Sequence, residues 1–394
     1  MNTIEEALQA LRKGGIIIVV DDEDRENEGD FILSADLATP ETVNFLSREG
    51  CGLICAALDS SRAEILNLKI PQGNSSLHGT AFTDSVDYIH GTTTGISASD
   101  RCATFLALAD QKTIPADLAR PGHVFPLIAK NGGVLERRGH TEATVDLCRL
   151  AGLSAVGILC EILNPDGTMA RLPQLENIAK KYNLPLISVE QLVLYRKTKE
   201  QIVVPLNTVC LPTPRGDFDL TMHSGLSHQA PLSLKRDKEN LELEIPLVRV
   251  HSECLTGDLF SSLRCDCGPQ LELAMDLIGK EPKGAIIYLR QEGRGIGLEA
   301  KLKAYSLQEQ GYDTWEANVL QGLPADGRDY WEAAQILKSW GWTTIRLLTN
   351  NPAKVVSLEK YGIKVNEILP LIIAPVDQNR QYLETKKVRF GHIL

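Results

Sequence analysis

Three cysteines lie close together within residues 251–268, at positions 254, 265 and 267. Their C-x10-C-x-C spacing lets three thiols converge on one zinc ion, and no fourth cysteine or histidine follows at short range. Structural zinc sites normally have four protein ligands, whereas catalytic sites leave one position for water. Ordinary buried or surface thiols are the alternative. The spacing, set among charged residues, favours a catalytic zinc on Cys254, Cys265 and Cys267.

A glycine-rich stretch, Arg290–Gly297, follows an apolar segment and opens a helical one. Backbone N–H groups at such a turn bind anionic oxygens, and arginine adds a bidentate grip on phosphate. The stretch matches neither the P-loop pattern nor G-x-G-x-x-G. Alone, it is equally well interpreted as a plain strand-to-helix turn. The zinc motif in the same half of the chain favours a phosphate-bearing substrate.

The first half carries an acidic run, Asp21–Asp30, directly after the apolar run Ile16–Val20. Carboxylates crowded at the end of a strand repel one another unless a cation or a basic substrate lies among them. The position of the glycine excludes an EF-hand loop, and a solvated acidic loop is the alternative. The place of the run after a buried strand favours a magnesium site.

A basic segment, Gly132–Glu142, can complement this acidic run. It places Arg137, Arg138, His140 and Thr141 at the start of a predicted helix, where positive charge and free N–H groups suit a phosphate. An isolated histidine is more often structural, but here His140 can join a carboxylate as a metal ligand.

The first half alternates between helical and strand patterns, and Thr3 and Glu6 are spaced as a capping box for its first helix. We predict helices at 3–13, 40–48, 99–109, 141–151 and 174–182, and strands at 16–20, 52–58, 80–88, 155–163 and 186–188.

The second half opens with β-type segments and then alternates again. We predict strands at 241–250, 284–289 and 344–348, and helices at 270–279, 298–311, 330–340 and 352–361. The polar stretch Tyr195–Val204 leads into Pro205, so we place the boundary there, between domains 1–200 and 201–394. The predicted fold is α+β, or mixed α/β, with two tandem domains that each contain a mixed sheet and flanking helices.

The composition argues against a nucleic-acid-binding, disulfide-rich or membrane protein. The 394 residues include 41 Lys and Arg against 51 Asp and Glu, a net charge of −10, whereas nucleic-acid binders show a basic excess. The nine cysteines are irregularly spaced, which argues against a disulfide framework and for a reducing compartment. We expect no signal peptide, and the sequence contains no apolar run long enough to span a bilayer. We expect a cytoplasmic protein without a nucleic-acid or membrane partner.

The motifs of the second half resemble GTP cyclohydrolase II over residues 201–394. They are His251–Gly268, Arg290–Leu298, Asp313–Asn318, Asp326–Tyr330 and Leu348–Lys354. The resemblance implies hydrolysis of GTP to 2,5-diamino-6-(5-phosphoribosylamino)pyrimidin-4-one, formate and pyrophosphate. It places one zinc ion on Cys254, Cys265 and Cys267, with a hydroxide that attacks C8 of guanine, and it is compatible with Mg²⁺ on the GTP phosphates.

The same resemblance implies roles for further residues. Asp326 would accept a proton, Arg328 would attack phosphate, and Tyr305 matches an active-site tyrosine. Because arginine stays protonated at ordinary pH, a phosphate clamp is the simpler role for Arg328. The implied GTP contacts are Arg249, Val250, His251, Ser252, Glu253, Gln270, Glu292, Gly293, Arg294, Thr314, Thr349 and Lys354. Gln321 and Leu323 stand where larger apolar residues are expected.

The first half resembles 3,4-dihydroxy-2-butanone 4-phosphate synthase over residues 1–200, through the acidic run, the basic segment and residues 80–83, 93–101 and 120–127. The resemblance implies conversion of ribulose 5-phosphate to 3,4-dihydroxy-2-butanone 4-phosphate and formate, with Mg²⁺ or Mn²⁺ on Glu26 and His140. His123 and Glu161 would be catalytic, as general acid and base. The implied substrate contacts are Arg25, Glu26, Asp30, Arg137, Arg138, Gly139, His140, Thr141 and Glu161.

Two positions depart from the synthase pattern: Ile128 replaces an expected arginine, and Asp84 replaces an expected apolar residue.

Three functions are therefore weighed. The first is a bifunctional lyase and hydrolase that feeds both branches of riboflavin synthesis, expected as a homodimer through its first domain. The second keeps only the GTP cyclohydrolase half active and makes the other half structural or regulatory. The third is a zinc-dependent nucleotide sensor without turnover.

Overall fold

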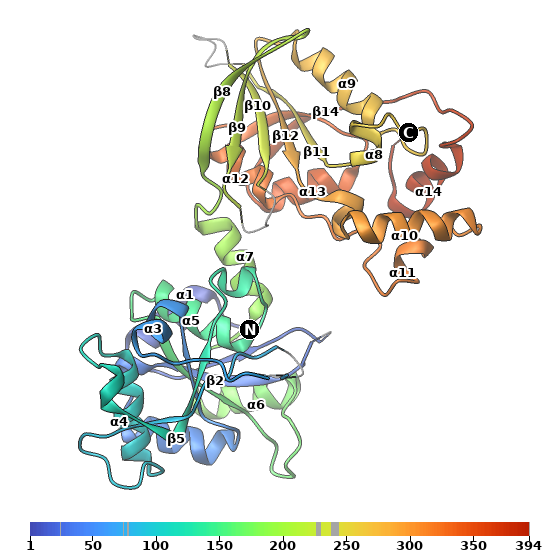
Figure 1. The fold of residues 1–394 in the computed structure, drawn as a ribbon. Coiled ribbons are helices and arrows are strands. Elements are labelled where there is room, and N and C mark those ends of the chain that lie inside the picture. The colour runs from blue at the N-terminus through green and yellow to red at the C-terminus, as the bar shows by residue number, and fades with distance from the viewer. Residues whose placement is uncertain (24, 74, 77–78, 226–229, 238–243, 394) are drawn as a thin grey trace. The chain divides into compact units, whose positions relative to one another are not determined.

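The computed structural model describes residues 1–394 except 24, 74, 77–78, 226–229, 238–243 and 394. The chain divides into two compact units, Met1–Arg196 and Lys197–Leu394 (Figure 1). Each unit contains a seven-stranded mixed sheet with helices packed against it, which confirms the predicted fold class. Among the described residues, no helix combines the length and the apolar character that crossing a membrane requires.

The sheet of the first unit combines parallel and antiparallel neighbours. The strand order is β4 (Val86–Tyr88), β5 (Leu118–Ile128), β3 (Cys55–Leu58), β6 (Val156–Glu161), β2 (Gly29–Ser34), β1 (Ile17–Val20) and β7 (Leu186–Ser188). β3 pairs with β5, and β1 with β7, in parallel, whereas the other neighbours are antiparallel.

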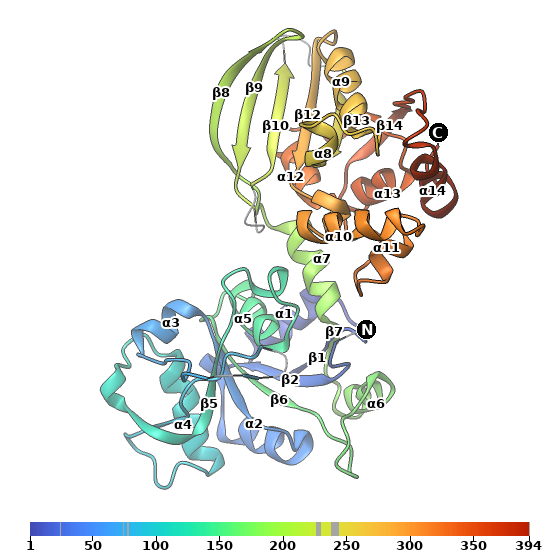
Figure 2. The same ribbon diagram turned by 45° about the vertical axis from the view of Figure 1, so that its right-hand side comes forward.

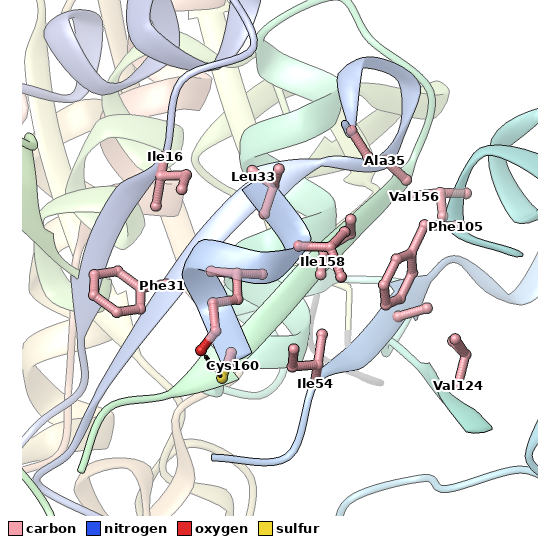
Figure 3. Close-up of a cluster of buried hydrophobic side chains, with 14 of the residues drawn as sticks. Ile16, Phe31, Leu33, Ala35, Ile54, Phe105, Val124, Val156, Ile158 and Cys160 are labelled. Carbon is pink, nitrogen blue, oxygen red and sulfur yellow. Dashed lines mark hydrogen bonds between the residues drawn. The ribbon is translucent and has the colours of Figure 1, made fainter. Parts of the chain in front are cut away.

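Strand β1 is buried on both faces because the sheet lies between two helical layers. Ile18 joins the core on one face and Ile17 the core on the other, as period-two alternation requires. The first core, which contains Phe31, Ile158 and Phe105, is shown in Figure 3. Helices α2 (Pro40–Phe45), α3 (Ser60–Ile65), α4 (Ala98–Ala109) and α6 (Leu172–Tyr182) cover it. The second core is covered by α1 (Ile4–Arg12), α5 (His140–Leu150) and α7 (Val189–Lys199).

Helix α1 forms as its sequence predicts. Thr3 and Glu6 make the reciprocal capping box, with Glu6 N donating to Thr3 Oγ1 at 3.2 Å and Thr3 N donating to Glu6 Oε2 at 2.7 Å. Ile4, Leu8 and Leu11 are buried on one stripe of the helix, so α1 is held by its apolar face.

Three sequence-based boundaries differ from the structure. The strand predicted at 80–88 is regular only over Val86–Tyr88, since Phe82 makes a single isolated bridge to Leu127. The helix predicted at 40–48 ends at Phe45 and continues as a wider π-type turn over Leu46–Gly50. The polar stretch from Tyr195 begins inside α7, where buried Leu192 and Val193 hold a helix that polar spacing alone does not reveal.

The second unit joins a parallel and an antiparallel half-sheet. Its order is β14 (Lys364–Leu369), β13 (Thr344–Leu348), β11 (Leu247–Ser252), β12 (Lys283–Leu289), β10 (Leu232–Asp237), β9 (Gly216–His223) and β8 (Pro205–Thr213). The first four are mutually parallel, and β12 through β8 are antiparallel. Figure 2 shows β8, β9, β10 and β12 side by side in this order. The strand predicted at 241–250 begins partly outside the described residues, and β11 starts at Leu247.

The parallel strands explain how distant motifs meet in this unit. Because β11, β12 and β13 run in one direction, their carboxyl ends lie along one edge of the sheet, where ligands of such sheets bind. The segments that follow these strands begin at 253, 290 and 349. Helices α8 (Leu255–Asp258), α9 (Cys267–Ile278), α10 (Leu298–Glu309), α11 (Glu316–Val319), α12 (Trp331–Ser339), α13 (Pro352–Lys360) and α14 (Arg380–Phe390) complete the unit.

Two candidate active sites

The three cysteines converge at the carboxyl end of β11. Cys254 precedes the short helix α8, and Cys267 is the first residue of α9. Their sulfur atoms lie within 4.8 Å of one another, with Cys254 Sγ and Cys265 Sγ 3.7 Å apart. Tetrahedral Zn–S bonds of about 2.3 Å would place sulfurs roughly 3.8 Å apart. Among the described residues, this group of candidate ligands contains three thiols and no histidine or carboxylate, so the donor set fits a three-thiolate ion.

A lysine stabilises negative charge on this cluster. Lys301 Nζ lies 3.2 Å from Cys254 Sγ and 2.7 Å from Glu292 Oε1. Hydrogen bonds from Cys265 and Cys267, together with the charge of Lys301, hold the pKa of Cys254 well below that of an ordinary thiol. Since the thiolate is the form that binds metal, the cluster is prepared for an ion.

His251, on β11, is fixed by a carboxylate. Its Nε2 lies 3.0 Å from Asp258 Oδ1, and the other oxygen of Asp258 accepts from Cys254 N at 2.9 Å and Tyr288 OH at 2.8 Å. Burial lowers the pKa of His251, so the ring is neutral at pH 7. Its Nδ1 is buried without a hydrogen-bond partner, which leaves that atom free to meet a ligand.

The glycine-rich stretch forms a left-handed turn between β12 and α10. Gly293 and Arg294 both have φ of 63°, an uncommon conformation for a residue with a side chain such as arginine. Arg294 NH1 donates to Thr314 Oγ1 at 3.3 Å, whereas its NH2 is buried without a partner. The turn therefore holds an incompletely bonded guanidinium beside the cysteines.

One pocket collects the GTP contacts that the resemblance implies. All of them except Val250 line it, as do Arg328, Tyr305 and the three cysteines. Val250 is fully buried in β11, and its carbonyl oxygen accepts from Lys354 Nζ at 2.6 Å. The sequence did not single out several further lining residues: Arg264, Gln291, Lys301, Asn318, Asn350, Asn351, Tyr382, Lys386 and His392.

Buried cations dominate one side of this pocket. Arg249 is 4% exposed, and its guanidinium donates to Leu348 O and Gln270 Oε1 while its Nε has no partner. Burial lowers the pKa of Arg249 to about 10, so the group stays charged at neutral pH. Burial and the charges of Arg249 and Arg328 also lower the pKa of Lys354. Buried cations with so little counter-charge suit an anionic ligand.

Asp326 and Arg328 form a bidentate pair. Arg328 Nε donates to Asp326 Oδ1 at 2.8 Å, and NH2 bonds the second oxygen. Although burial raises the pKa of Asp326, the bond and charge of Arg328 outweigh it, so the carboxylate is ionised. Tyr330 and Asp326 raise the pKa of Arg328 against the effect of its burial. Arg328 lines the pocket, whereas Asp326 reaches it through this pair.

The acidic run of the first unit meets the start of α5. Candidate ligand atoms of Asp21, Glu26 and His140 lie within 4.8 Å of one another. Asp21 was not singled out from the sequence. It holds the loop by accepting from Glu26 N at 3.2 Å and from Arg25 NH1 at 3.1 Å. Asp24 lies outside the described residues.

Three polar atoms at this cluster have no hydrogen-bond partner although they are buried: Asp30 Oδ1, Glu161 Oε2 and His140 Nε2. Asp30 and Glu161 are direct partners in the antiparallel β2–β6 ladder. Burial, then the charges of Glu161 and Glu26, raise the pKa of Asp30 well above its usual value, and burial lowers the pKa of His140. Unsatisfied acceptors beside a neutral imidazole fit a bound cation.

The basic segment and the acidic run are joined through the backbone. Arg25 NH1 donates to Arg138 O at 3.1 Å, and Arg138 NH1 lies 2.7 Å from Glu190 Oε2. Arg137 NH1 lies 2.6 Å from Glu142 Oε2. Gly139 is the N-cap of α5, so Thr141 lies in its first turn, as predicted.

His123 bonds to a carboxylate outside this cluster. Its Nδ1 lies 2.7 Å from Asp87 Oδ2 on the neighbouring strand β4, and its described hydrogen bonds and ion pairs do not include Glu26, Asp30 or His140. Of the two departures from the synthase pattern, Ile128 packs against the first hydrophobic core and Asp84 is exposed. Ile128 thus takes part in apolar packing.

Each of the two units matches a known protein family. Residues 5–195 match the family of 3,4-dihydroxy-2-butanone 4-phosphate synthase, and residues 206–370 match the family of GTP cyclohydrolase II. A solved structure of RibBX, described as a two-domain 3,4-dihydroxy-2-butanone 4-phosphate synthase from A. baumannii, is 31% identical with a TM-score of 0.70. The matched region covers 93% of this chain and 99% of the RibBX chain.

Full-length relatives are closer in sequence. Riboflavin biosynthesis protein RibBA of Cytophaga hutchinsonii is 53% identical over 397 residues, which cover 100% of this chain and 98% of that protein. The protein of the same name from Bacillus subtilis is 51% identical, covering 99% and 98%. With both family matches on one chain, the protein belongs to the bifunctional riboflavin biosynthesis enzymes that join a 3,4-dihydroxy-2-butanone 4-phosphate synthase to a GTP cyclohydrolase II.

Proposed function

We propose that residues 201–394 hydrolyse GTP to 2,5-diamino-6-(5-phosphoribosylamino)pyrimidin-4-one, formate and pyrophosphate, and that residues 1–200 convert ribulose 5-phosphate to 3,4-dihydroxy-2-butanone 4-phosphate and formate. The observation that carries the first activity is the convergence of three thiols and several buried cations on one pocket. The second activity is carried by the partnerless buried atoms beside Glu26 and His140.

In the GTP site, Cys254, Cys265 and Cys267 hold one zinc ion. Bound there, zinc supplies a nucleophile at neutral pH by lowering the pKa of water, which suits attack at C8 of guanine. Arg249, Arg328 and Lys354 bind the polyphosphate, and the permanent charge of Arg328 favours a clamp over a nucleophile. The other implied GTP contacts, except Val250, line the same pocket.

Proton transfer in this site is assigned to groups of the chain. Asp326 is ionised, so it can accept a proton while remaining bonded to Arg328. Tyr305 OH lies 3.1 Å from Thr256 Oγ1, close to the cysteine loop, and orients groups near the metal. His251 presents its free Nδ1 to the substrate.

In the synthase site, Glu26 and His140 bind Mg²⁺ or Mn²⁺, with Asp21 as an additional candidate ligand. Such an ion polarises a substrate carbonyl, which eases removal of the neighbouring proton. Glu161 serves as base, and Asp30, its partner in the β2–β6 ladder, contacts the substrate. Arg25, Arg137, Arg138 and the first turn of α5, from Gly139 to Thr141, bind the phosphate. His123, oriented by Asp87, is the further catalytic residue.

We place both reactions in the cytoplasm, because all nine cysteines are free thiols. The protein forms a homodimer through its first unit. It acts on small-molecule substrates and has no nucleic-acid or membrane partner.

Formate release tests it directly. The purified protein, loaded with zinc and magnesium, should release formate from GTP and, in a separate reaction, from ribulose 5-phosphate. Release from GTP alone would leave the first unit without its assigned reaction, and release from neither substrate would indicate a nucleotide sensor. Metal analysis should find one tightly held zinc per chain together with exchangeable magnesium.

A further inference from the structure

The C-terminal helix α14 lies beyond the residues that match GTP cyclohydrolase II, yet it forms part of the pocket. The family match ends at 370, whereas Tyr382, Lys386 and His392 line the pocket with the cysteines and Arg249. The segment is attached at its end, since Ile393 N donates to Asn350 O at 2.9 Å. Asn350 itself lines the pocket, so this attachment lies at the site.

A buried ion pair joins α14 to the cysteine motif. Lys386 Nζ lies 2.5 Å from Asp266 Oδ1, and the two residues are 8% and 1% exposed. Asp266 stands between Cys265 and Cys267 in the sequence. Its second oxygen accepts from Gln270 Nε2 at 2.6 Å, and Gln270 Oε1 accepts from Arg249 NH2 at 2.7 Å. One continuous chain of bonds therefore runs from α14 through the cysteine turn to a buried pocket arginine.

The same helix also contacts the glycine-rich turn. The guanidinium of Arg294 lies 4.3 Å from the ring centre of Phe390 and 5.7 Å from that of Tyr382. Cation–π contacts of this kind fix the orientation of a guanidinium without using its N–H donors. Arg294 NH2 is buried without a hydrogen-bond partner and faces the pocket from this turn.

We propose that α14 is a positioning wall of the GTP site: Lys386, through Asp266, sets the turn that carries Cys265 and Cys267, and Phe390 with Tyr382 aims Arg294 at the substrate. This inference rests on the proposed GTP cyclohydrolase function. It assigns no direct chemistry to α14, so Lys386 is a positioning residue. Removal of its charge should disturb both the metal-binding turn and GTP turnover.

Two lysines of α14 offer a matched pair for the test in the full-length protein. Lys386→Met removes the buried charge, and Lys387→Met removes the charge of its exposed neighbour. Lys386→Met should lower kcat/KM for GTP by at least about tenfold, the scale of one charge-assisted hydrogen bond. Lys387→Met should change it by less than about twofold, as expected for a surface charge. Lys386→Arg should recover most of the loss, and turnover of ribulose 5-phosphate should be equal in all variants.

A double-variant comparison tests the pairing itself. If Lys386 acts through Asp266, the loss in Lys386→Met combined with Asp266→Asn should be no larger than in Asp266→Asn alone. Losses that multiply would overturn the assignment, as would Lys386→Met behaving like Lys387→Met. If Lys386→Met does not fold, Phe390→Leu tests the cation–π contact with Arg294 instead, with an expected rise in KM of about threefold or more.

Cobalt in place of zinc gives a readout that does not depend on turnover. The visible d–d bands of thiolate-bound Co²⁺ report the geometry of the three sulfurs, so they should shift in Lys386→Met and stay unchanged in Lys387→Met. Unchanged bands in both variants would contradict the inference even where the unaltered protein hydrolyses GTP. An unaltered protein that releases no formate from GTP would refute the proposed function, and the cobalt spectra would still decide the role of α14.

Discussion

At the scale of single residues, the two sites have opposite kinds of unsatisfied charge. Arg249 and Lys354 are buried basic groups that form no ion pair with the described residues, whereas Asp30 Oδ1 and Glu161 Oε2 are buried carboxyl oxygens without a hydrogen-bond partner. The first arrangement favours an anionic ligand directly, and the second favours a metal ion that then receives one. Each site thus depends on residues that have no part in the other, and single substitutions should separate the two activities.

Cys265→Ser should abolish GTP turnover, with a fall of at least about a thousandfold, because a serine hydroxyl is a poor zinc ligand. Bound zinc should be lost in parallel, and formate from ribulose 5-phosphate should be unchanged. Cys210→Ser, at an exposed cysteine of the same unit, is the control and should match the unaltered protein. Zinc retained at one per chain in Cys265→Ser would contradict the three-thiolate site.

His140→Ala should have the converse effect. Loss of the imidazole removes a ligand from the cluster with Asp21 and Glu26, so formate from ribulose 5-phosphate should fall by at least about a hundredfold. GTP turnover should be retained. The exposed His90 provides the control substitution His90→Ala. Loss of both activities in a folded His140→Ala protein would show that the sites are coupled.

Residues close in sequence were the predictable part of these sites. The cysteine trio and the acidic run are visible because their members fall within short segments. Lys386 contacts Asp266 across 120 positions, and no local pattern marks it. Asp21 is a candidate ligand because its backbone hydrogen bonds and its burial hold it beside Glu26 and His140, and composition reveals neither.

Among the helices, α12 has a buried carboxyl group, that of Glu332, in its first turn. Burial, and then the charge of Asp329, raise the pKa of Glu332 to about 7, although Lys197 opposes the shift. Lys197 Nζ lies 2.6 Å from Asp329 Oδ2, so the nearest cation is already paired. Glu332 therefore keeps its proton in the folded protein over a pH range in which an unfolded chain releases it.

This pKa predicts a pH-dependent stability. Between the ordinary value of 4.5 and about 7, the folded protein binds more protons at Glu332 than the unfolded chain, so stability falls as pH rises through that window. The loss is on the order of 3 kcal/mol above pH 7. Glu332→Gln should raise the Tm of the second unit at pH 8 and leave it nearly unchanged at pH 4.5, as scanning calorimetry can measure. Glu359→Gln, at an exposed position, should show no such difference.

Elements were predictable where the spacing of apolar residues dominates. Helix α1 and strand β13 appear within one residue of their predicted bounds, because their buried positions follow one period. The stretch from 80 to 88 alternates in sequence, yet only its last three residues form a strand, and within that strand the register shifts between Val86 and Asp87. Helix α14 was missed because its polar residues pack inside a pocket and leave no apolar stripe.

At the scale of the whole molecule, each unit has its own sheet and its own buried cores. A core that is complete within one unit needs no help from the other to fold. Residues 1–200 and 201–394, produced as separate chains, should therefore both be soluble and show cooperative unfolding. The first piece should release formate from ribulose 5-phosphate and the second from GTP. Aggregation of either piece would show that its core depends on the other.

The closeness of the cysteine sulfurs also makes the metal-free site sensitive to oxidation. Cys254 Sγ and Cys265 Sγ are 3.7 Å apart, and a covalent bond would need them at about 2.05 Å. A thiolate such as Cys254 is the form that oxidants attack first. In protein stripped of its metal, air or peroxide should therefore join these two sulfurs, so that added zinc no longer restores GTP turnover until dithiothreitol has reduced the bond. The carboxylates and imidazole of the synthase site cannot form a disulfide. In an oxidised cell that is short of zinc, GTP hydrolysis should therefore stop before the conversion of ribulose 5-phosphate does.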